Sequence, residues 1–151
     1  GKITFLGAHY TGGNELLSLI DTSTTNYFWV TSLIGTSEAS DGRDKQYALA
    51  EMYNRDNETA NSVFYTAGIL VAQITTEAIK RLLIKDIPVT KNAIRNEFEL
   101  MNGNNAYLPY SSVGPVDYSS IDRAGVNTLQ IYQIQDNVFK AFGSTFTSSF
   151  Y

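Results

Sequence analysis

His9 has the clearest chemical potential in this sequence, because it is the one histidine of the chain and no cysteine accompanies it. A single imidazole leaves little room for a histidine-rich metal site, and the lack of cysteine removes thiolate metal sites, disulfides and cysteine nucleophiles. Serines are plentiful, but no Gly-x-Ser-x-Gly elbow occurs and His9 would be their only base. The sequence therefore predicts no catalytic residue, no metal and no cofactor, which argues against an enzyme.

Size and charge exclude further classes of function. The 151 residues match one ordinary domain or a piece of a larger protein. With 11 basic and 15 acidic residues the net charge is −4, which disfavours a nucleic-acid partner because phosphates require a basic face. No apolar run reaches the roughly 18–20 residues that a transmembrane helix needs.

The first part of the chain predicts a strand, a short helix and a second strand. Residues 2–8 and 26–34 are apolar and rich in β-branched or aromatic side chains, and residues 14–20 place leucines on one helical face. Such a β-α-β unit makes its two strands parallel neighbours.

His9, Tyr10 and Thr11 follow the first of these strands, and ligands of open parallel sheets bind at the carboxyl ends of the strands. Loop 9–11 is therefore the first candidate for a ligand site. Gly12 and Gly13 indicate a turn rather than a phosphate cradle, because the G-x-G-x-x-G pattern is absent.

Three helical patterns follow with no strand between them, over residues 43–54, residues 60–84, and from a cap at Thr90 to a stop at Asn102-Gly103. The long helix carries an apolar stripe with the 3.6-residue period and an ion-pair spacing between Glu77 and Arg81. The stripe consists of Ala67, Leu70, Val71, Ile74, Ala78 and Leu82. Helices in this number need a sheet to cover, which suggests a lobe whose sheet lies elsewhere.

The last part of the chain returns to strands. Leu129 and Ile131 mark a two-residue period over 128–135, which predicts a strand with its apolar side on a core. Asp136 and Asn137 suit a tight two-residue hairpin before Val138, because both residue types tolerate positive φ.

Three segments together resemble a known family. They are FLGAHYTGGNELL, FYTAGILVAQITTEAIKRLL and VGPVDYSSIDRAGVNTLQIYQIQDNVFKAF. In order and spacing they are similar to the C-terminal part of type I periplasmic solute-binding proteins, of the branched-chain amino acid (leucine-isoleucine-valine-binding) family that serves ABC importers.

The resemblance implies an α/β fold with parts of two doubly wound lobes, the first-lobe sheet being missing from this chain. Residues 1–36 would be a βαβ piece of the second lobe, and residues 37–112 would be helices of the first lobe. Residues 113–151 would return to the second lobe with the C-terminal strands and hairpin.

The resemblance also implies a function, namely binding of a small polar ligand, such as an amino acid, a carboxylate or an amide, between the lobes. The ligand-binding candidates are His9, Tyr10, Thr11, Phe64 and Tyr65, where His9 stands at a position that is often acidic in the family. The implied partners are the small-molecule ligand, an ABC permease and the missing N-terminal half of the same protein. The implied location is periplasmic or extracellular, with lipid anchoring through a precursor segment left open.

Two alternatives stay open at this stage. A ligand-sensing domain of a receptor or regulator would have the same fold. A small α/β enzyme is the second alternative, which the missing pairing of nucleophile and base disfavours.

Overall fold

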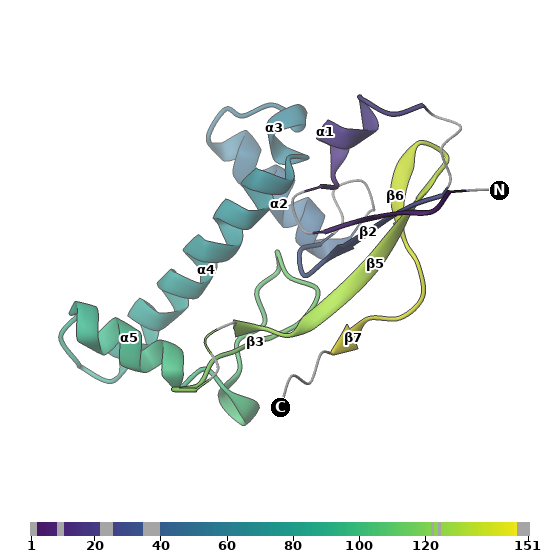
Figure 1. Cartoon of the computed structure of the whole chain (residues 1–151). Coiled ribbons are helices and arrows are strands. Elements are labelled where there is room, and N and C mark those ends of the chain that lie inside the picture. Colours follow the sequence, from purple (N-terminus) through teal and green to yellow (C-terminus); the bar gives the residue numbers. More distant parts are fainter. Residues whose placement is uncertain are drawn as a thin grey trace.

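A computed structural model describes residues 3–8, 11–21, 26–34, 40–121, 123 and 125–147. The helices are α1 (Asn14–Leu17), α2 (Asp41–Met52), α3 (Asn57–Ala60), α4 (Val63–Ile84) and α5 (Lys91–Glu99), followed by a 3₁₀ turn over Gly103–Asn105. The strands are β1 (Phe5–Gly7), β2 (Tyr27–Thr31), β3 (Val116–Asp117), β4 (Gly125–Val126), β5 (Thr128–Gln135), β6 (Val138–Ala141) and β7 (Phe146–Thr147). Helices α2 to α5 lie together on one side of the sheet (Figure 1).

The main sheet has the order β1-β2-β5-β6, and β7 also pairs with β5. Strands β1 and β2 are parallel, which confirms the prediction for the first part of the chain. Strands β5 and β6 are antiparallel to their neighbours, so the sheet is mixed. Strands β3 and β4 form a separate two-stranded ribbon.

The β5–β6 hairpin confirms the predicted two-residue turn. Gln135 pairs with Val138, and the two residues between them, Asp136 and Asn137, have φ of 54° and 61°. Positive φ at both central positions is the conformation that matches the twist of the flanking strands.

The buried face of β5 differs from the predicted one. The period of two is present, but the side chains that are buried belong to Gln130, Tyr132 and Ile134, whereas Leu129 and Ile131 are only half-buried. The reason is aromatic packing within the sheet, because Tyr132 lies opposite Trp29 of β2 and the two rings are 5.4 Å apart. The amide of Gln130 is accommodated by hydrogen bonds.

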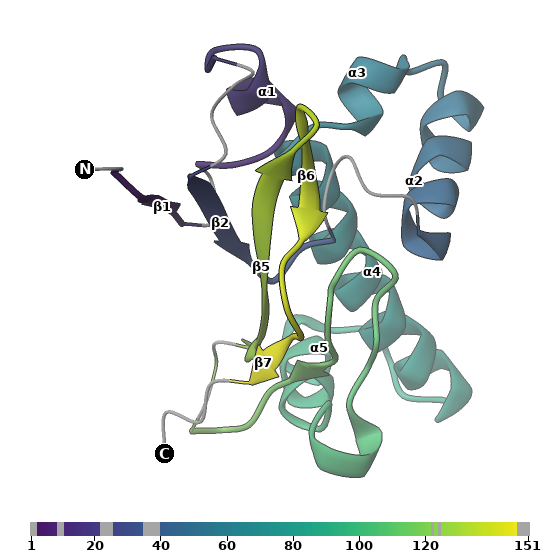
Figure 2. The same cartoon turned by 90° about the vertical axis from the view of Figure 1, so that its right-hand side faces the viewer.

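These hydrogen bonds are formed at a bulge between β6 and β7. Both strands pair with the same side of β5 (Figure 2). The β5–β6 and β5–β7 registers differ by two residues, so the strand opposite β5 carries two extra residues around Gly143. The Gln130 Nε2 donates to the carbonyl oxygens of Ile131 at 2.7 Å and of Phe142 and Gly143 at 3.3 Å each. The buried Gln130 amide thus adds a side-chain donor to the bulge, while the Ile131 carbonyl also accepts from the Phe142 N–H at 2.8 Å.

Helix α4 confirms most of the predicted stripe. Leu70, Ile74, Ala78 and Leu82 are buried, but Val71 is 65% exposed, contrary to the prediction. Other described residues of this chain bury the stripe. Leu70, Ile74 and Ala78 belong to a buried cluster that includes Met101 and Val116. The predicted ion pair between Glu77 and Arg81 is present, with a 2.8 Å distance between Oε1 and Nε.

Helix α5 begins as predicted, with the Thr90 hydroxyl accepting from the N–H of Ala93, but it ends three residues before the predicted stop at Asn102. The early end follows from the burial of Met101. Its side chain is fully buried, and its carbonyl accepts a hydrogen bond from the Tyr118 N–H at 2.8 Å. Tertiary contacts therefore end the helix before the sequence signal does.

Two segments distant in sequence run side by side where the chain passes between the sheet and the helices. The Ile34 N–H donates to the Ser111 carbonyl at 3.1 Å, and the Val113 N–H donates to the Ser32 carbonyl at 2.9 Å. The buried Ser112 hydroxyl also donates to the Ser32 carbonyl at 3.1 Å. Residues 32–34 and 111–113 thus form an antiparallel pair of connections.

Candidate functional site

The structure describes three of the five candidate ligand-binding residues. His9 and Tyr10 lie outside the described residues. Thr11 is exposed and follows β1, Phe64 is 61% exposed near the start of α4, and Tyr65 is half-buried beside it. Thr11 and Phe64 line the same pocket, whereas Tyr65 lines a neighbouring one.

The pocket that joins Thr11 to Phe64 lies between α1 and the start of α4, and we call it the α1–α4 pocket. Its volume is about 320 Å³, within the range of small-molecule sites. Most of its lining is apolar or aromatic, with a few polar atoms. The lining residues are Thr11, Gly12, Glu15, Leu16, Leu19, Tyr27, Val63 and Phe64.

Two glycines let the chain enter this pocket, which confirms the turn predicted for Gly12 and Gly13. A Cβ on Gly12 would lie 2.2 Å from ring atoms of Trp29, so only glycine lets the loop pass over that ring. Gly13 has a φ of +93°, a conformation that L side chains rarely adopt. The two glycines thereby position Glu15 and Leu16, the next lining residues, directly after a tight turn.

The hydroxyl groups of the α1–α4 pocket both give their protons to backbone carbonyls. The Thr11 Oγ1 donates to the Ala8 carbonyl at 2.7 Å, and the Tyr27 Oη donates to the Thr11 carbonyl. A hydroxyl carries one proton and two lone pairs. These two oxygens can therefore still accept hydrogen bonds from a ligand.

Glu15 is the ionisable residue that the sequence analysis missed. It lies in the first turn of α1, is exposed, and lines the pocket together with Thr11 and Phe64. The sequence offers one indication of this position: Glu15 lies in the short predicted helix that directly follows loop 9–11. Residue type alone did not separate it from the other exposed acids.

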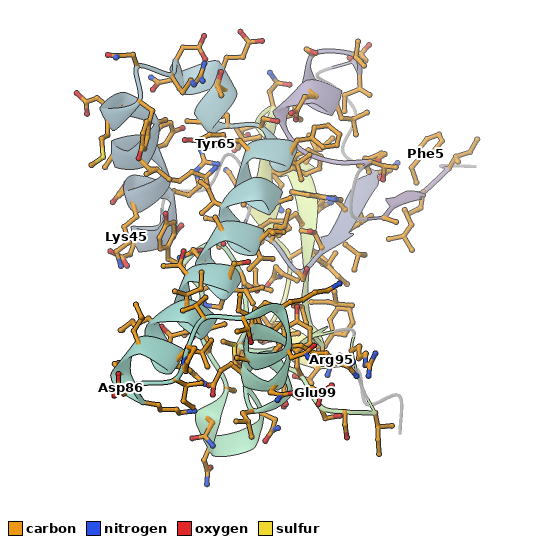
Figure 3. The ribbon with its side chains drawn as sticks, turned by 90° about the vertical axis from the view of Figure 1, so that its left-hand side faces the viewer. Phe5, Lys45, Tyr65, Asp86, Arg95 and Glu99 are labelled. Carbon is orange, nitrogen blue, oxygen red and sulfur yellow. The ribbon has the colours of Figure 1, made fainter. Side chains whose placement is uncertain are left out.

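Tyr65 lines the second pocket, of about 380 Å³, on the opposite side of Phe64. This pocket is almost entirely apolar and lies between α2 and α4. Its lining residues are Leu49, Tyr53, Arg55, Phe64, Tyr65, Gly68, Ile69 and Ala72. Figure 3 shows Tyr65 on the first part of α4, far from Arg95 and Glu99 on α5. Phe64 therefore separates two adjoining pockets.

A buried polar cluster fixes the helices around these pockets. The Arg43 guanidinium donates to the Tyr47 hydroxyl at 2.6 Å and to the Asn61 side chain, and Tyr47 also donates to Asn61. Burial lowers the pKa of Arg43, while its contacts with Tyr47 raise it. Gln46 donates to the Ala60 carbonyl at 2.5 Å and thereby ties α2 to α3. Gln46 also donates to the buried Thr66 hydroxyl at 2.8 Å, which ties α2 to the start of α4.

A third pocket, of about 260 Å³, lies at the far end of the helices and contains Arg95, Glu99 and Arg123. Its two cations already face an anion, since Glu99 Oε1 lies 3.3 Å from Arg95 Nε and 3.6 Å from Arg123 Nη2. This pocket is therefore a paired surface cluster rather than a free anion site.

The α1–α4 pocket combines apolar walls with two hydroxyl groups that donate to backbone carbonyls. Over the described ranges, no group of three or more histidine, cysteine, aspartate or glutamate side chains is arranged to hold a metal ion. Nor does any helix in those ranges combine the length and apolar character that crossing a membrane requires. Thr11, the described residue of the predicted loop 9–11, donates its hydroxyl proton to the Ala8 carbonyl.

Comparisons with known proteins point in the same direction. No protein-family profile matches the chain, and neither does any curated protein sequence. Among solved structures, a branched-chain amino acid ABC transporter protein from Thermus thermophilus, with bound valine, is 31% identical with a TM-score of 0.88. The match covers 99% of this chain and 40% of that one.

Two more distant structures share the fold. An ABC transporter substrate-binding protein from Aeropyrum pernix is 15% identical with a TM-score of 0.73, and covers 97% of this chain and 38% of its own. An ABC transporter permease structure from the Pseudomonas fluorescens group is 18% identical with a TM-score of 0.69. That match covers 95% of this chain and 37% of the other chain. All three are ABC transporter proteins, and none is described as an enzyme.

This chain spans at most 40% of the length of these three proteins. Its mixed α/β fold matches part of a periplasmic-binding-protein-like molecule. The resemblance predicted from the sequence is confirmed: over nearly its whole length, the chain is similar to the substrate-binding proteins of branched-chain amino acid ABC transporters.

Proposed function

We propose that the full-length gene product is the extracytoplasmic solute-binding component of an ABC importer. It binds a small polar solute, such as an amino acid, a carboxylate or an amide. The observation that carries this proposal is the 31% identity over 99% of the chain to a transporter protein with bound valine. An ABC permease is the partner that would receive the loaded protein.

The ligand site that we propose includes His9, Tyr10, Thr11, Phe64 and Tyr65. Support comes from the α1–α4 pocket, where Thr11 and Phe64 approach from different elements. Binding would draw the loop after β1 and the start of α4 together around the solute and exclude water from it.

The mechanism that we propose is hinge closure of two lobes, with residues 1–36 and 113–151 in one lobe and residues 37–112 in the other. The paired connections 32–34 and 111–113 support this division, because they lie at its two boundaries. Adjacent connections can bend together, and a few residues that absorb the backbone change suffice for a hinge. Solute would shift the open–closed equilibrium without breaking a bond.

A thermal-shift screen of the full-length gene product tests this function. The panel contains amino acids, amides, and aliphatic and aromatic carboxylates. A solute at 100 times its Kd adds about 2.7 kcal/mol of stability, which raises Tm by several degrees. No shift with any member of the panel would contradict the proposal.

The site assignment is tested in the same experiment with Phe64→Ala. We expect this variant to keep its unliganded Tm, because the ring is mostly exposed, and to lose most of the solute-induced shift. The matched control is Val71→Ala, an exposed apolar residue two turns along the same helix that lines none of the pockets described above. Equal shifts in both variants would move the site away from Phe64.

A further inference from the structure

Two aromatic side chains of β2 support the loop that follows β1. Tyr27 and Trp29 are two residues apart on this strand and therefore project from the same face of the sheet. The loop meets Trp29 at Gly12, where an added Cβ would overlap the ring. It meets Tyr27 at Thr11, whose carbonyl accepts a hydrogen bond from the tyrosine hydroxyl. Both rings pack against the fully buried Phe139 of β6, with centroid distances of 6.2 Å from Tyr27 and 5.2 Å from Trp29.

Gly7 leaves the space that the Tyr27 hydroxyl occupies. A Cβ on Gly7 would lie 2.1 Å from the Tyr27 oxygen, far inside van der Waals contact. Gly7 is the last residue of β1 and stands directly before the loop. The hydrogen bond from Tyr27 to Thr11 therefore depends on two positions of the sequence, a donor on β2 and a residue without a side chain on β1.

This hydrogen bond attaches Thr11 to the sheet. The Thr11 N–H donates to the Ala8 carbonyl at 2.9 Å, and the Thr11 hydroxyl donates to the same carbonyl at 2.7 Å. Both of these bonds are local, so they shape the turn without joining it to another element. The bond from Tyr27 links residues 16 positions apart, and of these three bonds it is the one that reaches a second strand.

Such an attachment matters for binding because it decides how often the loop is in place before a solute arrives. Thr11 is exposed and lines the α1–α4 pocket, and the candidates His9 and Tyr10 belong to the same loop. If only a fraction of the molecules has the loop in place, the apparent affinity falls by that fraction. Loss of one hydrogen bond typically changes such an equilibrium by about fivefold.

We infer that Tyr27 is a positioning residue for solute binding. Its hydroxyl holds Thr11, and with it the end of loop 9–11, against the sheet in the conformation that binds. It acts through Thr11 and not through contact with the solute. This inference rests on the proposed solute-binding function and assigns a role outside the five proposed ligand-binding residues.

The test uses the full-length gene product with Tyr27→Phe, which keeps the ring against Phe139 and removes the donor. The matched control is Tyr118→Phe. Tyr118 is also half-buried, packs 5.9 Å from the Phe98 ring and lies against a glycine, Gly125, but it lines a different pocket. A third protein carries 4-aminophenylalanine at position 27, which restores a hydrogen-bond donor at the same end of the ring.

Two quantities are measured for each protein. Amide hydrogen exchange of the unliganded protein reports how often the Thr11 N–H opens to solvent. Titration calorimetry gives Kd for L-valine, because a similar transporter protein has bound valine, and for each member of the thermal-shift panel that raises Tm. We expect Tyr27→Phe to speed exchange at Thr11 and to raise Kd, each by about fivefold, with an unliganded Tm close to that of the wild type. Tyr118→Phe should leave both quantities unchanged, and 4-aminophenylalanine should restore both.

The two quantities separate the outcomes. A higher Kd with unchanged exchange in Tyr27→Phe would show direct contact between the hydroxyl and the solute, and would refute positioning through Thr11. Faster exchange with an unchanged Kd would show that the hydrogen bond serves the fold alone. In both cases the solute-binding function stands. If neither L-valine nor any panel member binds the wild-type protein, the inference and the proposed function fail together.

Discussion

Gly12 illustrates how single residues shape the candidate site. The loop that enters the α1–α4 pocket crosses the Trp29 ring so closely that a methyl group at Gly12 would lie 2.2–2.4 Å from three of its atoms. The ring is fully buried and packs between Tyr132 and Phe139, with centroid distances of 5.4 and 5.2 Å. Because the ring has no free space to move into, a side chain at Gly12 would displace the loop itself.

We therefore predict that Gly12→Ala lowers the free energy of unfolding by about 1–3 kcal/mol, the usual cost of overpacking a core. Urea unfolding measures it. The control is Gly68→Ala in the interior of α4, where an added Cβ meets nothing within 4 Å. That variant should instead gain up to about 1 kcal/mol from helix propensity. A Gly12→Ala protein as stable as the wild type would mean that the loop does not rest on Trp29.

At this scale the sequence predicted part of the candidate site. Thr11 and Phe64 were named from the loop after the first strand and from the family resemblance, and they line one pocket. The sequence did not predict that Glu15 and Tyr27 line this pocket. The place of Glu15 depends on the direction of the short α1, and that of Tyr27 on the hydrogen bond from its hydroxyl to the Thr11 carbonyl. Neither fact is encoded in residue spacing.

Among the helices, α3 begins at an N-cap residue, Asp56, whose charge changes with pH. The Asp56 Oδ1 accepts a hydrogen bond from the Thr59 N–H at 2.7 Å, at the start of this four-residue helix. That bond to the Thr59 backbone holds the pKa of Asp56 below its ordinary value. The folded state therefore binds fewer protons than the unfolded state near that pKa, so the stabilising contribution is present at neutral pH.

The contribution should be lost as the pH falls below the ordinary aspartate pKa of about 4 and through the lower pKa of the folded state. We predict that Asp56→Asn, which still caps the helix but does not titrate, loses less stability between pH 7 and pH 3 than the wild type. Urea midpoints at the two pH values measure the difference. Asp86→Asn is the control, since the Asp86 side chain is exposed, forms no ion pair with any described residue and lies in the turn after α4 (Figure 3). Identical acid sensitivity in all three proteins would refute the prediction.

Elements with strong local signals were predicted well. The 22 residues of α4 carry a sustained stripe, and the Asp136-Asn137 turn has residues that tolerate positive φ, so both were found. Features that depend on tertiary contacts were not. The buried face of β5 is set by its cross-strand neighbour Trp29 on β2, and α5 ends early because Met101 enters the core. Local propensity does not contain either constraint.

At the scale of the whole molecule, large apolar side chains are exposed at the β1 edge. Strand β1 ends the described sheet order, and Ile3, Phe5 and Leu6 are 70%, 52% and 73% exposed. Figure 3 shows Phe5 projecting from this strand, away from the helices. Unpaired backbone groups beside exposed apolar side chains form a template for another strand.

We predict that the 151-residue chain produced by itself associates through the β1 edge. Size-exclusion chromatography with light scattering should show a mass above that of a monomer, which rises with concentration. Leu6→Lys should shift the chain towards the monomer, because a lysine on an edge strand opposes strand addition. Leu108→Lys, at an exposed leucine on a loop outside the main sheet, should leave the association unchanged. A wild-type chain that stays monomeric at every concentration, or equal effects of both lysines, would show that association does not use this edge.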